Sequence, residues 1–433
     1  MKHFTLTFVL FAVMCRTASA EVFTWNNAAG GNWLDSANWD SVSGSYPQQP
    51  GDIADFVNLG SVNFTVSIPD VTAVTCGVIR CAVLSNSVSF IGANMNRSFI
   101  VLTNDGGTAG ILVNAPRASS GMCFLFNTCT IKFMQPTLLM AKQASGIEFD
   151  GNLVWMGSTV VTTRNEGTAN QYIRMYNNIS PNFTGEVVVE YNDLFFRNTI
   201  AITNTSLVRA GGTGYILNRE TTTRFPVKLA QGGRYHLTGN GVGTHSGAII
   251  AEGDVRVTTD NTLSLPGGVS GTGTVYMTGS GGTARYTGSV SPGASVGMLG
   301  FNEDGGTLQL GITGDNLLLN IEVTGNGGVP GIDHDQLVIQ NLGTALDLAN
   351  LDVAFSGVAS GQATNWFLVG NAIDLATDFA SVEYGAGVSG TIVKEDSFDG
   401  SNDRVGAILV PEPAAALLGL AAVLALRRRM RHE

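Results

Sequence analysis

Short runs of alternating apolar and polar residues recur throughout the interior of the chain. Most runs are three to six residues long and rich in Val, Ile, Phe and Thr, and Gly, Asn, Asp or Ser bounds them. This pattern is typical of strands joined by tight turns. The clearest runs are residues 63–68, 87–91, 98–102, 110–113, 124–126, 130–133, 153–155, 186–189, 254–257 and 274–277. Because strands and turns repeat with polar Asn and Thr between apolar rows, we expect a solenoid whose coils bury apolar faces against one another.

The extent of this pattern favours one all-β architecture. We predict a right-handed parallel β-helix, or solenoid, over residues 61–300 and a β-rich C-terminal region over residues 301–409. The roughly 390 residues between the two chain ends exceed the size of a usual sandwich domain. Glycine stays frequent throughout, at 55 of 433 residues, and no change of composition marks a domain boundary. A sandwich array or a propeller is the alternative, because no sharp repeat period fixes the number of coils.

Tryptophan is concentrated at the start of the predicted solenoid. Trp25, Trp33 and Trp39 lie within fifteen residues of one another, next to Asn and Gly turns. The first coil of a solenoid exposes apolar surface unless a cap covers it, so we predict that residues 21–60 form a cap with these indoles in its core. Exposed indoles, stacking on sugars, are the alternative. Two further tryptophans with apolar neighbours are expected to be buried: Trp155 and Trp366.

Residues 1–20 have the organisation of a secretory signal peptide. A basic start, an apolar stretch and a small-residue end follow one another as Lys2 and His3, residues 4–14, and Ala18, Ser19 and Ala20. The secretion translocon and signal peptidase recognise this order, and we predict cleavage after Ala20. A lipoprotein site at Cys15 is the alternative, but Met14 stands before it where a small residue is needed.

The C-terminal end combines a Pro-Glu-Pro motif, an apolar run over residues 414–426 and a basic terminus. The residues that flank the run are Pro411, Glu412 and Pro413 before it and Arg427, Arg428, Arg429 and Arg431 after it. At about 1.5 Å per residue, a helix of this run spans roughly 20 Å, short of a hydrocarbon core of about 30 Å. We therefore predict a short transmembrane helix within residues 410–433, a transient inner-membrane anchor with its arginines in the cytoplasm.

This arrangement resembles the PEP-CTERM sorting signal of Gram-negative bacteria that make extracellular polysaccharide. The resemblance covers the motif at residues 411–413, the apolar run and the arginines after it. In that family a membrane peptidase, exosortase, recognises the signal and removes the tail. The resemblance therefore implies an exported protein that exosortase processes and that ends at the cell surface or in the extracellular matrix. A plain tail anchor or a chance apolar terminus is the alternative.

The rest of the chain resembles the autotransporter-associated β-strand repeat proteins exported by planctomycetes and related bacteria. The similar segments are the Trp-rich residues 23–56, Gly-Thr-Gly at 271–273, Ser-Pro-Gly-Ala-Ser-Val-Gly-Met-Leu at 291–299 and Asp-Gln-Leu-Val at 335–338. They cover both ends of the predicted passenger and little of its middle. The resemblance implies a β-helix with a β-rich C-terminal segment, and it brings no catalytic residues.

Charge excludes two classes of partner. The chain has 23 basic and 34 acidic residues. Two of the basic residues lie in residues 1–20, and four basic residues and one acidic residue lie in residues 414–433, so the remainder carries a net charge of −16. Such a surface repels nucleic acid and anionic lipid, and we exclude both as principal partners.

Four cysteines remain after the predicted signal peptide: Cys76, Cys81, Cys123 and Cys129. The export route is oxidising, so we expect disulfides among them, and four cysteines allow three pairings. Buried free thiols are the alternative. Their spacings lack C-x-x-C and no His lies nearby, which argues against a zinc site.

The sequence contains no convincing catalytic or metal-binding constellation. The one acid-His-acid cluster, Asp333, His334 and Asp335, lies in a predicted turn, where we expect solvated side chains and an Asp that caps local amides. His236 and His245 are expected in loops. Glu303 with Asp304, and Asp396 with Asp399 and Asp403, are candidate calcium ligands, but they lack the pattern of a calcium-binding loop. Gly279, Gly281 and Ala284 imitate a dinucleotide-binding fingerprint, but no helix is expected after them. We predict no catalytic residue, metal or cofactor.

Together these features predict a structural or adhesion protein of the cell surface or extracellular matrix that associates with exopolysaccharide. Many shallow contacts along a repetitive polar face would add through avidity. A secreted β-helical polysaccharide lyase or hydrolase is the alternative, with carboxylates brought together across coils. A self-associating matrix subunit is a third possibility.

Overall fold

The computed structural model describes residues 20–411 apart from several short segments. Those segments are residues 58, 60–62, 82–86, 115–120, 144, 151–152, 168–172, 177–178, 181, 198–200, 203–206, 219–221, 238–241, 280, 294, 326, 358–362 and 387. Two predicted regions lie outside the described residues: the signal peptide up to residue 19, with Ala18, and the tail from residue 412, with Glu412, Pro413, Arg427, Arg428, Arg429 and Arg431.

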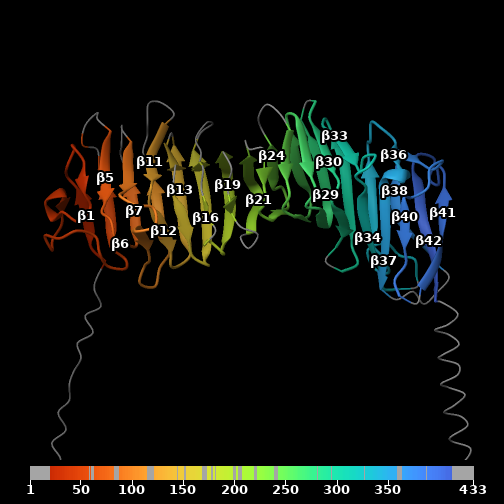
Figure 1. The fold of residues 1–433 in the computed structure, drawn as a ribbon, viewed down its shortest axis with the longest axis horizontal. Helices are drawn as coiled ribbons and strands as arrows, with labels where there is room; N and C mark the ends of the chain where they lie inside the picture. The colour runs from red at the N-terminus through yellow and green to blue at the C-terminus, as the bar shows by residue number, and fades with distance from the viewer. Residues whose placement is uncertain are drawn as a thin grey trace, which may run out of the picture.

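The described chain is all-β, as predicted, and most of its strands pair in parallel. Successive coils stack along one axis, and Figure 1 shows an elongated molecule with the first strands at one end and the last strands at the other. Helical structure in the described residues is confined to the 3-10 turns Ser36–Asn38 and Leu348–Asn350. No helix of this part of the chain is long and apolar enough to cross a membrane. The arrangement is that of a β-rich solenoid.

Three rows of paired strands run along the molecule, and we name them the first, second and third faces. The first face contains β1 (Val22–Trp25), β4 (Ile53–Phe56), β7 (Val78–Cys81), β10 (Ala109–Val113), β13 (Thr137–Gln143), β16 (Val160–Gly167), the starts of β19 (Glu186–Arg197) and β21 (Leu207–Asn218), β23 (Val227–Ala230), β26 (Ile249–Glu252), the start of β29 (Val269–Thr278), β31 (Ser289–Pro292), β34 (Leu317–Val323), β37 (Leu351–Gly357) and β40 (Ser381–Glu383). Each strand pairs in parallel with the next one in this row.

The second face follows the same order along the axis. It contains β2 (Gly31–Asn32), β5 (Phe64–Ile68), β8 (Val88–Gly92), β11 (Gly121–Asn127), β14 (Ser145–Asp150), β17 (Ile173–Tyr176), the ends of β19 and β21, β24 (Arg234–Leu237), β27 (Val255–Thr259), the end of β29, β32 (Met298–Asp304), β35 (Gln336–Gln340) and β38 (Thr364–Gly370). Because β19, β21 and β29 run through both rows, the first and second faces form one continuous sheet.

The third face is interrupted. Its separate sheets are β6 (Thr72–Cys76), β9 (Ser98–Leu102), β12 (Thr130–Phe133) and β15 (Val154–Met156); β18 (Ile179–Ser180) and β20 (Ala201–Ile202); β22 (Thr222–Thr223), β25 (Val242–His245), β28 (Thr262–Leu265), β30 (Thr283–Tyr286) and β33 (Thr307–Leu310); and β36 (Leu346–Asp347) and β39 (Ile373–Asp374). Irregular pairing is therefore concentrated on this face.

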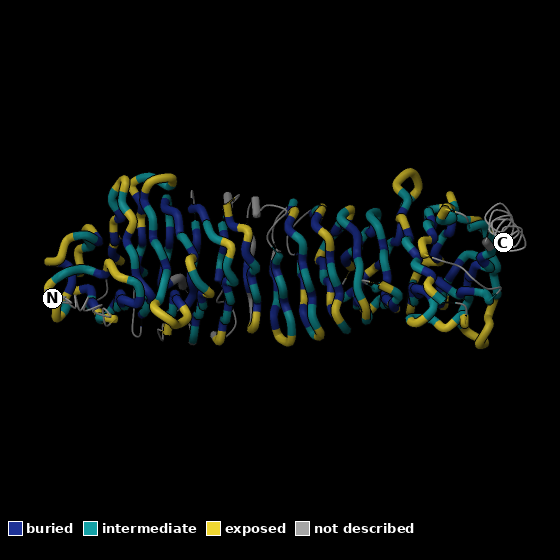
Figure 2. The backbone as a smooth tube through the Cα atoms, turned by 90° about the horizontal axis from the view of Figure 1, so that it is seen from below, coloured by how far each residue is buried: buried dark blue, intermediate teal, exposed yellow. Residues whose placement is uncertain are grey.

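Alternation of side chains explains these strands. In β5, Phe64, Val66 and Ile68 are buried while the residues between them are exposed, as the period of two requires. All ten runs predicted from the sequence fall on strands. Figure 2 shows the same alternation of buried and more exposed positions along each coil. Paired positions also bring side chains of the same type together in the core. Phe90 and Phe126 are partners in the ladder, and their ring centroids lie 4.6 Å apart.

Coil length varies strongly, which explains why the sequence shows no sharp period. Val208 pairs with Val227, nineteen positions later. Leu319 pairs with Val353, thirty-four positions later. The turns absorb this difference while the paired strands keep a common register.

Three tryptophans pack together near the N-terminal end. Trp25 and Trp33 are completely buried and Trp39 nearly so. The ring centroid of Trp39 lies 4.9 Å from that of Trp25 and 5.1 Å from that of Trp33. Each indole nitrogen donates to a backbone carbonyl, so burial leaves no indole N–H unpaired in this cluster. The predicted burial of these rings is confirmed, and the exposed sugar platform is wrong.

Antiparallel pairing closes the other end. β42 (Asp403–Pro411) lies between β38 and β41 (Val388–Glu395) and is antiparallel to both. The strand ends at Pro411, which is opposite Val388. The predicted sorting motif thus begins at the last residue of the described sheet.

Candidate functional site

A groove opens on the third face where two neighbouring coils separate. These coils pair directly on the first face, through β31 and β34, and on the second face, through β32 and β35. On the third face β33 pairs with β30, and β36 pairs with β39, but the described residues form no ladder between β33 and β36. The backbone edges of β33 and β36 therefore face a gap instead of each other.

Two contacts fix the width of this gap. The Glu303 carboxylate bridges the coils, because Oε1 accepts from Leu308 N at 2.6 Å and Oε2 accepts from Gly343 N at 2.7 Å. Near the other end Gly311 has a φ of +68°, and a Cβ there would lie 2.2 Å from the Asn350 carbonyl oxygen. Only glycine fits this close approach. The Glu303 carboxylate therefore joins the two coils at one end of the groove, and the close approach of Gly311 to Asn350 brings them together near the other end.

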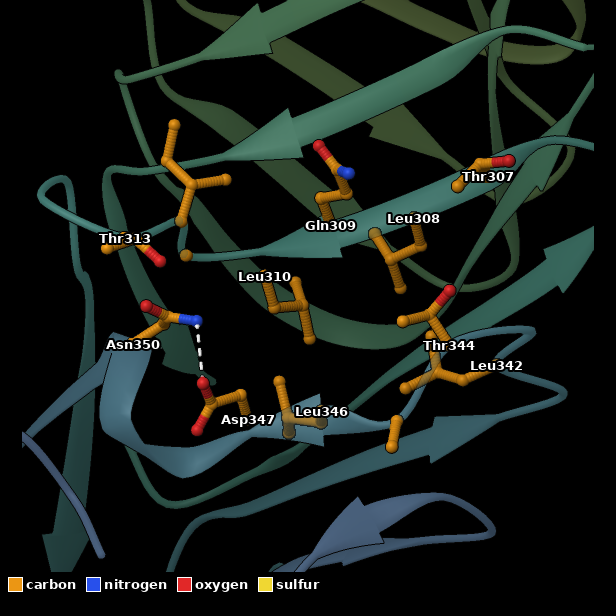
Figure 3. A pocket seen from close by; sticks show the side chains of 13 residues that line it. Thr307, Leu308, Gln309, Leu310, Thr313, Leu342, Thr344, Leu346, Asp347 and Asn350 are labelled. Atoms are coloured by element: carbon orange, nitrogen blue, oxygen red, sulfur yellow. Dashed lines mark hydrogen bonds between the residues drawn. The ribbon is translucent and has the colours of Figure 1, made fainter. Parts of the chain in front are cut away.

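The groove has a volume of about 320 Å³ and an amphipathic lining. Figure 3 shows residues of β33 on one wall and residues of β36 and its neighbours on the other. Leu308, Leu310 and Leu346 are buried at its base. The polar lining residues, all at least partly exposed, are Thr307, Gln309, Thr313, Thr344, Asp347 and Asn350. Its volume lies at the low end of the range for small-molecule sites, about 300–1,000 Å³.

Asp347 is the one ionisable side chain among the residues that line the groove. Its Oδ1 accepts from Ala349 N at 2.9 Å, and its Oδ2 accepts from Asn350 Nδ2 at 3.3 Å. On the opposite wall, Gln309 Oε1 accepts from Arg285 Nε at 2.8 Å, which leaves the Gln309 amide hydrogens to donate. A single carboxylate without a second acid or base suits binding better than acid–base catalysis.

The Asp333, His334 and Asp335 side chains do not converge on one point. Asp333 Oδ2 accepts from Val329 N at 2.9 Å, which is the local capping that the sequence predicts. His334 is completely buried and its Nε2 donates to the Trp366 carbonyl at 3.1 Å. Burial lowers the pKa of His334, although the bond to Trp366 and the nearby Asp333 oppose that effect. The expectation of a solvated histidine is therefore wrong.

Asp335 joins two distant segments and is also buried, contrary to expectation. Its Oδ1 accepts from Gly297 N at 2.7 Å and its Oδ2 accepts from Glu322 N at 2.8 Å. Burial raises the pKa of Asp335 to about 6, and these two hydrogen bonds oppose the rise. Asp335 and Glu322 border a cavity of about 310 Å³ together with Ser291, Pro292, Gly293, Ser295, Asn320 and Ser356. This carboxylate pair is the site that sequence reasoning did not connect, because its members lie thirteen positions apart, on either side of the long turn between β34 and β35.

Both histidines expected in loops lie on strands, so that expectation is wrong. His236 is on β24, and its Nε2 lies 3.2 Å from Asp260 Oδ1. His245 ends β25, is completely buried and has its Nδ1 2.7 Å from Thr223 Oγ1. Burial lowers the pKa of both imidazoles, that of His245 to about 3. Their Gly-rich surroundings hid the alternation that places them on strands.

Trp366 is only half-buried, so the expectation that it is buried is wrong, whereas Trp155 is completely buried as predicted. The Arg404 guanidinium lies 3.8 Å from the centroid of the Trp366 ring. β38 alternates inward and outward side chains, and Trp366 falls on an outward position beside β42. A cation–π contact therefore takes the place of core burial.

All four cysteines lie in the core. Cys76 and Cys129 carry free thiols, which contradicts the expected disulfides for these two residues. Burial raises the pKa of the Cys129 thiol to about 12, and burial, with Asp52 nearby, raises that of Cys76 still further. Cys76 ends β6 on the third face whereas Cys81 ends β7 on the first face. These two cysteines are close in the sequence but lie on different faces of the solenoid.

The other acidic candidates serve local turns. Asp399 accepts from Ser401 N, Asn402 N and Asn402 Nδ2, and the bond from the Asn402 side chain contributes most to lowering its pKa to about 2. Asp403 accepts from Ser397 N at 3.1 Å. The described residues contain no group of three or more His, Cys, Asp or Glu side chains arranged to hold a metal ion. After Gly279 and Gly281 the chain enters strand β30 instead of the helix that a dinucleotide site needs.

Comparison of the chain with protein-family models, with curated proteins and with solved structures found no match.

Proposed function

We propose that the chain is an exported structural or adhesion protein that reaches the cell surface or the extracellular matrix and associates with exopolysaccharide. In this proposal the signal peptide directs export, and an exosortase-type peptidase acts on the PEP-CTERM tail after transient anchoring in the inner membrane. The body is a right-handed parallel β-helix of the autotransporter-associated type. Its role is to present a long polar surface.

The observation that carries the proposal is the elongated stack of coils with a filled apolar core. Because the inward positions are occupied by the core, recognition falls to the outward positions, which repeat from coil to coil. Thr262, Thr283 and Thr307, for example, form one row across β28, β30 and β33. Repeated weak contacts along such a row add through avidity.

Charge pairs between neighbouring coils support a structural role for the surface. Arg80 Nη2 lies 2.8 Å from Asp55 Oδ2, and Lys142 Nζ lies 2.9 Å from Glu166 Oε2. Partly exposed pairs of this kind contribute about 0–1 kcal/mol each. The cations of these pairs are already neutralised by carboxylates, which favours shallow polar contacts over recognition of an anionic ligand.

The two similar motifs near the C-terminal end also support the β-helix of the proposal. The segment at 291–299 and the segment at 335–338 are joined by the hydrogen bond from Gly297 N to Asp335. A shared structural contact gives a physical reason for both motifs to occur in one chain.

Processing is tested by fractionating cells that produce the full chain and determining both termini of the protein by mass spectrometry. We expect loss of residues 1–20 and of the tail after the Pro-Glu-Pro motif, with the product in surface or matrix fractions. A Glu412→Ala variant should keep its tail and stay with the membrane. An uncut protein in the cytosol would refute export.

A secreted carbohydrate-active enzyme is the second candidate, and the carboxylates of Asp335 and Glu322 favour it. A carboxyl with a pKa of about 6 resembles a general acid. Both Asp335 oxygens, however, accept backbone hydrogen bonds, which suits a structural role. Release of reducing or unsaturated ends from a polysaccharide, abolished by Asp335→Asn in a protein that stays folded by circular dichroism, would establish the enzyme instead.

A further inference from the structure

The groove between β33 and β36 lies where two of the separate sheets of the third face end. Its depth comes from the separation of two coils, and its apolar base is formed by Leu308, Leu310 and Leu346. Small-molecule sites combine such an apolar base with a few polar groups that fix orientation. The groove therefore has the composition of a binding site, and it lies at the end of the threonine row that reaches Thr307.

The polar groups of the lining are neutral donors and acceptors with one exception. Thr307, Thr313 and Thr344 bring hydroxyls from both walls, and Gln309 brings amide hydrogens. A hydroxyl both donates and accepts, which matches the hydroxyls of a sugar ring. Ile312 and Leu342, the partly exposed apolar side chains of the lining, provide contact for the apolar C–H surface of the same ring. The combination matches a ligand that is polar along its edge and apolar on its face.

We propose that this groove binds a short segment of neutral polysaccharide through the hydroxyl and amide groups of its two walls. The proposal rests on the proposed association with exopolysaccharide and names the site and the ligand class. Asp347 is the one charged residue of the lining, and the whole chain has a formal net charge of −11. Both repel uronic acids and sulfated sugars, so the ligand is neutral.

An extended peptide is the competing occupant, because an open strand edge can pair with an added strand. The groove is less suited to it. The Leu308 amide, which a new strand would need at the edge of β33, already donates to Glu303. The same carboxylate holds Gly343 N on the opposite coil and so blocks a continuous ladder.

Affinity electrophoresis of the full chain tests the proposal, because an acidic protein migrates readily in native gels that contain polysaccharide. Dextran and galactomannan are the neutral probes, alginate is the anionic probe, and an alternating Val-Thr peptide in solution is the competitor. The double variant Gln309→Leu with Thr344→Val removes hydrogen-bonding groups from both walls. The matched control is Gln340→Leu with Thr65→Val, which changes the same residue types outside the groove and outside the threonine row.

We expect at least one neutral polysaccharide to retard the protein, alginate not to, and the double variant to raise the apparent Kd about tenfold. The control should bind like the wild type, and all variants should melt at the same temperature. Equal binding by wild type and groove variant would overturn the groove but leave the association with polysaccharide intact. If no polysaccharide retards the protein, both the groove proposal and the proposed association with polysaccharide are refuted. If the peptide displaces the polysaccharide, the groove binds an added strand instead.

Discussion

Acidification should destabilise the middle of the solenoid through one buried imidazole. His245 is completely buried and its Nε2 has no hydrogen-bond partner in the described structure. Its Nδ1 is close to two hydroxyls, at 2.7 Å from Thr223 Oγ1 and 3.3 Å from Tyr235 Oη. Burial disfavours the charged imidazolium and lowers the pKa of His245 from 6.5 to about 3. Between pH 6.5 and pH 3 the imidazole is therefore protonated in the unfolded chain and neutral in the folded chain.

The sign and size of the effect follow from this difference. The folded pKa is lower than the unfolded one, so the stabilisation is fully present above pH 6.5 and is lost as the pH falls towards 3. Each pH unit inside that window costs about 1.4 kcal/mol, which gives about 2 kcal/mol between pH 7 and pH 5 and about 5 kcal/mol in total. The interval from pH 7 to 5 is the useful one, because most carboxylates stay ionised there.

Urea denaturation followed by circular dichroism at several pH values measures the effect. The His245→Phe variant removes the titrating group and leaves the contact between Thr223 Oγ1 and Tyr235 Oη, at 3.1 Å, in place. We expect the wild type to lose about 2 kcal/mol more than this variant between pH 7 and pH 5. His236→Gln is the matched control and should change the slope less, because Asp260 partly opposes the lowered pKa of His236. Parallel pH profiles for the wild type and His245→Phe would refute the reasoning, as would an NMR titration of folded His245 near pH 6.5.

Three other substitutions or reagents probe the cap, the C-terminal coils and the core thiols. Trp33→Ala should cost about 3–5 kcal/mol of unfolding free energy by leaving a cavity in the cap, and a loss below 1 kcal/mol in urea denaturation would contradict the buried cluster. Asp335→Ala leaves the buried amides of Gly297 and Glu322 without an acceptor and should lower the free energy of unfolding by about 2–5 kcal/mol, whereas Asp335→Asn should recover part of this loss. Equal melting temperatures for the wild type and both variants would show that these hydrogen bonds are dispensable. Cys129, with its raised pKa, should react with a thiol reagent in denaturant only, and rapid labelling of the native protein would contradict its burial.

Strand existence was predictable from the sequence because each coil must bury alternate side chains. The predicted run at 98–102 is β9, where Ser98, Ile100 and Leu102 are buried and the residues between them less so. The Trp-rich cap was predictable for the same reason, since large apolar side chains next to turns have to find a core. Local pattern was enough wherever burial alone decides the conformation.

The residues of the groove were not predictable, because the groove depends on which coils fail to pair. The sequence marks Glu303 only as a candidate calcium ligand, whereas in the structure its carboxylate accepts from amides that lie five and forty positions away. β36 has two residues and carries no strand signal of its own. His245 was missed for a related reason, since Gly243 beside it suggested a loop while inward alternation from β25 buries the imidazole.

The interruption of the third face connects the fold to the proposed binding site. The first and second faces form one continuous sheet and tolerate little variation, because a break would leave backbone groups without partners. The third face is already divided, so separated coils are accommodated there. The long coil between Leu319 and Val353 supplies the second wall of the groove, but its extra residues lie between β34 and β35, away from the groove. The proposed site therefore depends on the missing pairing between β33 and β36, while the strands of the other two faces keep these coils joined.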